Sequence, residues 1–454
     1  MRFDVHTHFF TTGMAGKGVD AFLSTLRLRE MLDRIATVGD RTEADAHPVE
    51  AFLKNSTSED GEATLSDLDN AAGEPMACCP LMLDVGYMEK ILPSPGKGVA
   101  RTRTRVAGTV ADTLLGWKDA VASRRGGRAD AAVETVSRWI SEAEERFRTV
   151  QIGAVENDTG RAFDSQITTL TELKKRHSDR IFPFLGVDPR RNDALDGKLL
   201  SFIGDMVGKG RTFAGVKLYP PIGFSPTDPF LFGKGGFYEY AEKNGIPITV
   251  HFSAAGFAVM SDRVAAQGDI YDDDSGEIAS VTDIFEDGVI DFHASIVNVG
   301  EAISERIRVF NHPKLWAKVL DVYPRLTLNL AHFGGFGRLH QYLDGRRAGH
   351  WSAFAREAII KYPNVYADLS GWFEKREDTS IRHPLATFVA DVYAKLPGNA
   401  RSKVLYGSDW FILSLKDPDL GTYIKRFTAA FGKEWDAVSV KNPNAFLART
   451  IEYK

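Results

Sequence analysis

The sequence has little cysteine and no long apolar run. Its two cysteines, Cys78 and Cys79, are adjacent in a chain of 454 residues, so they cannot join distant segments through disulfide bonds. Such usage is typical of a reducing compartment and predicts a cytoplasmic protein. No segment is apolar for long enough to span a bilayer, and no basic segment followed by an apolar one precedes the first strand. We therefore expect neither a membrane protein nor a secreted one.

The chain also lacks a strong excess of charge of either sign. It has 56 Lys and Arg against 61 Asp and Glu, a net charge of -5, which offers no general field for nucleic acid or for an anionic membrane. Its apolar content of 43% and charged content of 26% are ordinary for a globular protein with a large core. The length exceeds a typical domain but suits a barrel of eight βα units with insertions.

Short apolar segments alternate with helical patterns along most of the chain. This alternation predicts βαβ units, in which the strands are parallel. Eight segments read as strands, centred near residues 3, 82, 183, 216, 249, 329, 367 and 406. Eight strands close a barrel with a packed interior, so we predict a distorted (β/α)8 TIM barrel. A doubly wound open sheet is the alternative, but no Gly-x-Gly-x-x-Gly turn follows the first strand.

The remaining length falls into insertions after strands 1, 2 and 5. We predict one domain over residues 1–454, interrupted at about 9–74, 86–130 and 252–310. The first insertion is expected to contain a helix over 19–38 and a polar, acidic tract from Arg41 to Asn70, with a solvated loop at 55–62. Another helix is expected over 131–149.

Residues with metal-binding chemistry occur where the predicted strands end. His6 and His8 share one face of the first strand, with α-carbons roughly 6.5–7 Å apart, so both imidazoles can reach one metal ion. A lone His-x-His pattern also arises by chance. However, other strands carry polar residues at or near the same end: Lys217, His251, His332 and Asp409. In a (β/α)8 barrel the carboxyl ends of all strands meet at one mouth.

The order His-x-His, Lys, His, His, Asp resembles the amidohydrolase superfamily of metal-dependent barrels. The segments 215–221 (Gly-Val-Lys-Leu-Tyr-Pro-Pro), 330–335 (Leu-Ala-His-Phe-Gly-Gly) and 407–410 (Gly-Ser-Asp-Trp) resemble its amidohydrolase-related branch. That branch includes aminocarboxymuconate-semialdehyde decarboxylase. The resemblance covers the strands and most of 131–251 and 313–450, but not the three insertions.

The resemblance implies a role for each of these residues. His6, His8 and His251 would bind the metal, and Asp409 would be a fourth ligand that also moves protons. His332 would orient or deprotonate the metal-bound water, or stabilise a developing negative charge. Imidazoles with a carboxylate suit zinc, which lowers the pKa of bound water to about 7; manganese is the alternative, and one ion is favoured over two.

Lys217 has three interpretations. In binuclear relatives a lysine from this strand is carboxylated and bridges two metals. In mononuclear relatives Lys217 would instead stabilise a substrate carboxylate or an oxyanion. A barrel lysine paired with a neighbouring acid remains the third interpretation.

The main functional prediction is a metal-dependent hydrolase whose activated water attacks a carbonyl of an amide, ester or lactone. The alternative is non-oxidative decarboxylation of an unsaturated or aromatic acid, and a second alternative is an inactive metal-binding barrel. The expected partner is a small molecule, with a carboxylate among the candidates, and neither nucleic acid nor membrane; self-association into a homo-oligomer stays open. Aromatic residues that follow the strand ends predict a partly aromatic pocket: Phe9, Phe10, Tyr219, Phe252, Phe257, Phe333, Trp372 and Trp410.

Overall fold

Eight parallel strands form the centre of the part of the chain that the computed structural model describes. The described residues are 1–9, 60–87, 158–259, 261–292, 299–335, 339, 342–343, 351–372, 384–410, 412 and 419–451. The strands are β1 (Phe3–Thr7), β2 (Ala77–Pro80), β3 (Phe184–Gly186), β4 (Gly215–Leu218), β5 (Ile248–Val250), β10 (Leu328–Leu330), β11 (Val365–Asp368) and β12 (Val404–Leu405). Each lies at or within a few residues of a predicted strand.

These strands close into a barrel. β1 pairs with β2, and a six-stranded ladder runs β12-β11-β10-β5-β4-β3. Parallel bridges from Cys78 to Ile181 and from Leu81 to Phe184 join β2 to β3. A parallel bridge from Thr7 to Trp410 joins β1 to the segment that follows β12. The predicted (β/α)8 barrel is therefore confirmed.

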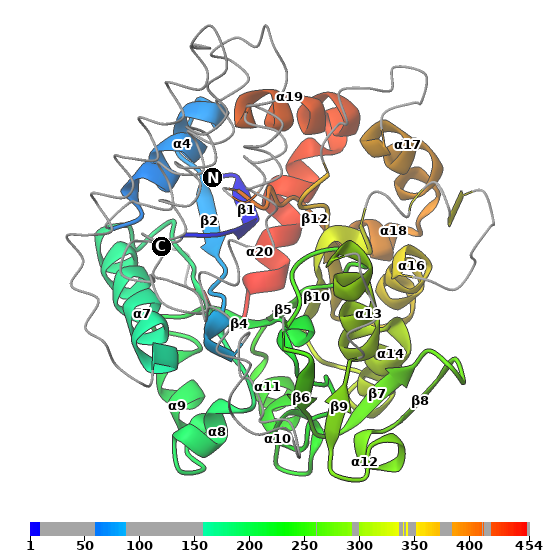
Figure 1. Cartoon of the computed structure of the whole chain (residues 1–454). Coiled ribbons are helices and arrows are strands. Elements are labelled where there is room, and N and C mark those ends of the chain that lie inside the picture. Colours follow the sequence, from blue (N-terminus) through cyan, green and yellow to red (C-terminus); the bar gives the residue numbers. More distant parts are fainter. Residues whose placement is uncertain are drawn as a thin grey trace, which may run out of the picture.

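Helices surround the barrel, as Figure 1 shows. The described helices are α4 (Glu62–Ala72), α7 (Asp158–Arg176), α8 (Arg191–Ala194), α9 (Leu199–Met206), α10 (Pro229–Phe232), α11 (Phe237–Asn244), α12 (Val281–Ile284), α13 (Val299–Asn311), α14 (Pro313–Val322), α16 (Trp351–Lys361), α17 (Pro384–Asp391), α18 (Gly398–Arg401), α19 (Leu420–Phe431) and α20 (Asn442–Leu447). Within the described ranges, none is both long and apolar enough to cross a membrane.

One part of the barrel interior is filled by apolar side chains. A buried cluster joins residues of β1, β2, β3, β11 and β12 to Phe446 of α20, whose ring stacks 6.1 Å from that of Phe184. Phe184 pairs with Gly215, and Gly186 pairs with Lys217. Since paired residues of parallel strands face the same side and alternate residues share a face, Phe184 and Lys217 both face inward. The apolar cluster thus lies nearer the amino ends of the strands, and the polar residues lie nearer their carboxyl ends.

The first predicted insertion contains a barrel helix that the sequence analysis missed. We expected a polar tract up to Asn70, but α4 begins at Glu62. Leu65 and Leu68 are 1% and 0% exposed, a spacing of three that puts both on one helix face. Acidic and other polar residues occupy most of the remaining positions and concealed this short apolar stripe, so the prediction was wrong here. The expected helices over 19–38 and 131–149, and nearly all of the insertion at 86–130, lie outside the described residues.

The segment after β5 builds a small substructure of its own. β6 (Arg263–Ala265) pairs antiparallel with β9 (Val289–Asp291), and β7 (Asp269–Asp272) pairs antiparallel with β8 (Glu277–Ser280). A separate apolar cluster, which includes Val264, Ile270 and Phe292, holds these strands against α13. Figure 1 shows them together at one side of the barrel.

Candidate metal centre

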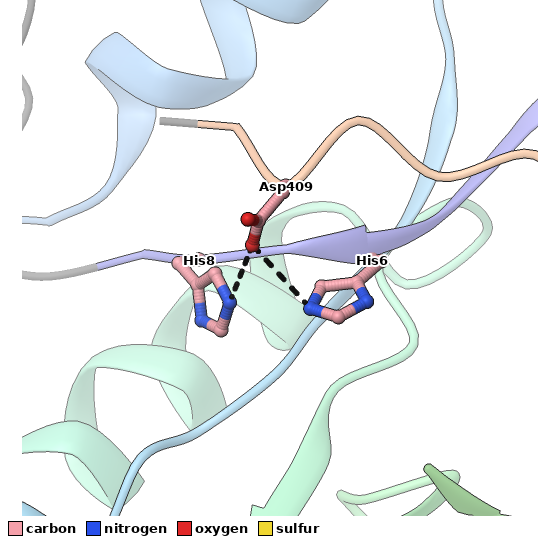
Figure 2. Close-up of side chains that lie close together, drawn as sticks. All are labelled: His6, His8 and Asp409. Atoms are coloured by element: carbon pink, nitrogen blue, oxygen red, sulfur yellow. Dashed lines mark ion pairs between the residues drawn. The ribbon is translucent and has the colours of Figure 1, made fainter. Parts of the chain in front are cut away.

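The first and last strands of the barrel bring two histidines and a carboxylate together. Nε2 of His8 lies 3.2 Å from Oδ1 of Asp409, and Nε2 of His6 lies 3.5 Å from the same oxygen. In Figure 2 both imidazoles extend from β1 toward Asp409, which enters from the loop after β12. One ligand atom from each of the three residues lies within 4.8 Å of the others. This spacing suits three ligands of one ion.

The backbone around these residues is specialised. The pairing of β1 with β2 shifts register between Asp4 and Thr7, and irregularities of this kind re-aim side chains beside active sites. Asp409 has a left-handed backbone, with φ of 65°, and its N–H donates to the carbonyl of His6 at 2.8 Å. Oδ1 of buried Asp4 accepts from the backbone N–H groups of His6 and Ser408, at 3.1 and 3.0 Å. These bonds lock the two strand ends to one another.

Four imidazoles are each anchored through one ring nitrogen. Nδ1 of His8 lies 3.0 Å from the carbonyl of Leu81, and Nε2 of His251 lies 2.7 Å from that of Ala255. Nδ1 of His6 lies 3.1 Å from Oδ2 of Asp368, and Nδ1 of His332 lies 3.1 Å from the carbonyl of Ser370. Because a carbonyl or carboxylate oxygen only accepts, each anchored nitrogen carries the proton. The second nitrogen of each ring is left with its lone pair, as a metal ligand requires.

His251 and His332 form the second half of the centre. Nδ1 of His251 lies 3.2 Å from Nε2 of His332, and the rings of His332 and His6 are 4.8 Å apart. His251 is therefore linked to the group of His6, His8 and Asp409 through His332. Two lone pairs that face each other at this distance repel unless a cation lies close to them, which fits a divalent ion beside these two rings.

The pKa shifts of these residues favour the protonation states that bind a cation. Burial lowers the pKa of His6 to about 3 and also depresses the pKa values of His251 and His332. Burial alone would raise the pKa of Asp409, but its contact with His8 and the neighbouring His6 hold that pKa well below its usual range. Neutral imidazoles and an ionised carboxylate are the protonation states that metal binding requires. The residues present therefore fit a divalent metal.

Lys217 lies in β4 and is 2% exposed. Among the described residues its Nζ has no hydrogen-bond partner. Burial lowers its pKa to about 8, and the negative charges of Asp368 and Asp409 limit that decrease. At neutral pH the amine therefore stays mostly protonated, as a buried cation without a bonded anion.

Asp368 was not predicted as a site residue, although it contacts both His6 and His332. It ends β11, is fully buried and, with His6 and His332, forms a second group of potential ligands. Its position at the end of the seventh strand was the available signal, since other strands end in the residues already named. Its neighbour Ser370 was missed too, because serine alone carries no ligand pattern.

Only some of the aromatic residues expected to line a pocket lie beside the histidines. The ring of Tyr219 stacks 4.4 Å from that of His251, and the ring of Phe257 stacks on Tyr219 at 6.0 Å. Phe333 and Trp372 instead pack against Phe388 in the core. Phe10 lies outside the described residues.

Comparison with known proteins identifies the family of the chain. A model of the Amidohydrolase family (Amidohydro_2) matches residues 3–446. The chain belongs to the Amidohydrolase family. It is thus a metal-dependent enzyme of the amidohydrolase superfamily, as the resemblance implied. No curated protein matches the chain.

Solved structures of this superfamily are similar to the chain at low identity. A 2,6-dihydroxybenzoate decarboxylase, in complex with 2,6-dihydroxybenzoate, is 13% identical, with a TM-score of 0.43 over 98% of this chain and 99% of that one. A 5-carboxyvanillate decarboxylase from Novosphingobium aromaticivorans, in complex with manganese and 4-hydroxy-3-methoxy-5-nitrobenzoic acid, is 12% identical, with a TM-score of 0.45 over 99% and 96%.

Proposed function

We propose that this amidohydrolase-family protein is a metal-dependent decarboxylase of a small aromatic or unsaturated carboxylic acid. The observation that carries the proposal is the buried, unbonded Nζ of Lys217 within the described part of the barrel mouth. A buried ammonium without a partner is costly, so a site that keeps one is suited to an anionic ligand. A substrate carboxylate supplies that anion.

The ring arrangement around His251 supports a flat substrate. Tyr219, Phe257 and His251 stack with interplanar angles of 21° in each pair. Parallel aromatic surfaces favour planar, conjugated ligands through offset stacking. Conjugation is also what decarboxylation needs, because the electron pair left by the departing carbon dioxide must be delocalised or protonated.

The metal would be held by His6, His8, His251 and Asp409, with zinc as the first candidate, manganese as the second, and one ion rather than two. When bound, it supplies a Lewis acid that polarises a substrate oxygen. Lys217 binds and orients the anionic substrate in this proposal. Without it, the substrate carboxylate would lie near Asp368 and Asp409 with one positive charge fewer beside them.

Decarboxylation requires a proton at the carbon that loses its carboxylate. The bond between that carbon and the carboxyl carbon breaks, its electron pair stays on the substrate, and a proton replaces carbon dioxide. Because Asp409 is ionised, it takes this proton from water and passes it to the carbon. Its side chain is 18% exposed, whereas those of His6 and His8 are 1% and 3% exposed, so Asp409 is the more accessible group for this transfer. His332, adjacent to both His6 and His251, is placed in our scheme to stabilise the developing charge.

Hydrolysis of an amide, ester or lactone is the second candidate. The contact of Asp409 with His8 favours it, since a carboxylate beside the ligands can take a proton from water and return it to a leaving group. In that case Lys217 would hold an oxyanion, or would be carboxylated in a two-metal site.

Isotope labelling separates the two reactions. The metal-loaded protein is incubated in D2O with hydroxylated benzoates and unsaturated diacids, and in water enriched in oxygen-18 with esters, amides and lactones. Decarboxylation gives carbon dioxide and one deuterium at the former carboxyl position, whereas hydrolysis gives a product that carries oxygen-18. Oxygen-18 incorporation without carbon dioxide would overturn the decarboxylase proposal. Asp409→Asn serves as the inactive control for either reaction.

A further inference from the structure

The carboxylate of Asp368 is saturated with hydrogen bonds. Its Oδ2 lies 3.1 Å from Nδ1 of His6 and 2.7 Å from Nδ2 of Asn329. Its Oδ1 accepts from the backbone N–H groups of His332 and Ser370, at 3.0 Å each, and from the Ser370 hydroxyl at 2.5 Å. Two carboxylate oxygens offer about four lone-pair positions, so these contacts leave none for a metal.

We propose that Asp368 is a positioning residue which fixes the tautomer of His6 and the turn at His332, and thereby sets the affinity of the centre for its divalent metal. The inference rests on the metal centre of the proposed function but not on the reaction. It also explains why Asp368 lies among potential ligands without being one.

The first effect acts on His6. Because Oδ2 of Asp368 only accepts, it keeps the proton of His6 on Nδ1, and Nε2 is left to face Asp409. If the proton moved to Nε2, an N–H group would point at the metal position. Partners of this kind orient metal-bound histidines and raise their basicity, and their loss typically lowers metal affinity 10–100-fold.

The second effect acts on the backbone of His332. This residue has φ of 66°, a left-handed conformation that a side chain other than glycine adopts rarely. The N–H of His332 donates to Asp368, and its carbonyl accepts from Nε1 of Trp372 at 3.0 Å. The same carbonyl also accepts from the N–H of Gly335 at 2.8 Å. Both polar groups of the turn are thus held, and Asp368 is the acceptor for the N–H.

Ser370 connects the two effects. Its hydroxyl lies 2.9 Å from Nδ1 of His6 and 2.9 Å from Nδ1 of His332. With its own proton donated to Asp368, the Ser370 oxygen accepts from these rings. One carboxylate and one hydroxyl therefore hold two of the four imidazoles.

The test compares Asp368→Asn with Asp188→Asn in the full-length protein. Asp188 is equally buried, follows β3 near the mouth and contacts Arg190 rather than a histidine, at 2.5 Å. Zinc affinity is measured by competition with a chelating indicator, and thermal stability is measured on the metal-free forms. We expect Asp368→Asn to weaken zinc binding about 10–100-fold, and Asp188→Asn to lower stability without changing zinc affinity.

A second readout follows the histidine tautomers without metal. Nitrogen-15 NMR of histidine-labelled, metal-free protein, with His6 assigned through His6→Gln, should show Nδ1–H in wild type and a shift toward Nε2–H in Asp368→Asn. If Asp368→Asn does not fold, Ser370→Ala replaces it with the same two readouts and a smaller expected loss of affinity. Wild-type zinc affinity together with wild-type tautomers in the folded variant overturns the inference.

Different experimental results would reject the two proposals. Zinc binding by wild type that is insensitive to Asp368 rejects this inference and leaves the decarboxylase proposal intact. A wild type that binds no metal rejects the proposed function, and the tautomer measurement then decides the role of Asp368 alone.

Discussion

The backbone N–H of Asp409 donates to the backbone carbonyl of His6 at 2.8 Å, so the last strand end of the barrel is tied to the first. The same two residues lie with His8 in the group of potential metal ligands. Closure of the barrel therefore also brings these potential metal ligands together. A metal that binds the closed barrel and not the unfolded chain must also stabilise it.

The first expectation concerns metal content. Wild type should carry about one divalent ion per chain by elemental analysis, and Asp409→Asn should carry much less, because one ligand charge is lost. At a free metal concentration of 100 times the Kd, the ion should add about 2.7 kcal/mol to the free energy of unfolding, which chelation removes. Asp419→Asn, at the exposed start of α19, is the control and should keep wild-type content. Two ions per chain would indicate carboxylation of Lys217, and none would contradict the site.

Lys217→Met and Lys403→Met should have opposite effects. Both lysines are buried, but Nζ of Lys403 donates to the carbonyls of Ile359 and Tyr362, at 2.8 and 2.6 Å. Loss of Lys217 should raise the KM for a carboxylate substrate roughly 10- to 150-fold, the equivalent of a charged hydrogen bond of about 1.5–3 kcal/mol, while leaving the Tm unchanged or higher. Loss of Lys403 should lower the Tm and leave the KM unchanged. An unchanged KM in Lys217→Met would remove the support for an anionic substrate.

Gly256→Ala should damage the centre more than Gly276→Ala does. A Cβ at Gly256 would lie 2.7 Å from Nε2 of His251 and 2.6 Å from the hydroxyl of Tyr219. At Gly276 the nearest atom, the Tyr271 hydroxyl, is 3.8 Å away. Both glycines have positive φ, 138° at Gly256 and 72° at Gly276, so both substitutions strain the backbone. Only Gly256→Ala is expected to weaken zinc binding. Equal zinc affinities in the two variants would show that His251 is not a ligand.

The stability of the metal-free protein should depend on the protonation of Asp228. Burial raises its pKa from 3.8 to about 6, although its carboxylate caps α10 by accepting from the Phe230 N–H. The folded state therefore takes up a proton near pH 6 that the unfolded chain takes up near pH 4. Wild type should gain stability relative to Asp228→Asn as the pH falls from 7 to 4, by up to about 3 kcal/mol, since each pKa unit corresponds to about 1.4 kcal/mol.

Urea unfolding of wild type and Asp228→Asn between pH 7 and pH 4 measures this difference in stability. The asparagine oxygen can still cap the helix, so the substitution removes only the titrating carboxyl group. The comparison of wild type with Asp419→Asn should show the opposite dependence of stability on pH. Hydrogen bonds from Thr422 lower the pKa of Asp419, so wild type should lose stability relative to this variant as the pH falls. A stability difference between wild type and Asp228→Asn that stays constant with pH would contradict the shift.

The sequence determined the barrel and the candidate ligands, because both are local patterns. A short apolar run between helical patterns marks a buried parallel strand. Helix α11 ends at Gly245, because glycine adopts the left-handed conformation there at little cost. His6, His8, Lys217, His251, His332 and Asp409 could be named because each lies at or near the end of an apolar strand. Cytoplasmic location and self-association stay predictions.

Only the tertiary structure decided how these residues act on one another. Asp368 contacts His6 across 362 residues of sequence, a pairing that depends on strand order and register. The register shift in β1 and the left-handed turns at His332 and Asp409 are held by hydrogen bonds from other strands, so no local propensity reveals them. Nζ of Lys217 has no hydrogen-bond partner among the described residues, and this depends on the side chains packed around it rather than on the local sequence. The sequence therefore identified the chemical groups. Closure of the barrel sets the distances between these groups and buries them, and this determines their geometry and their protonation states.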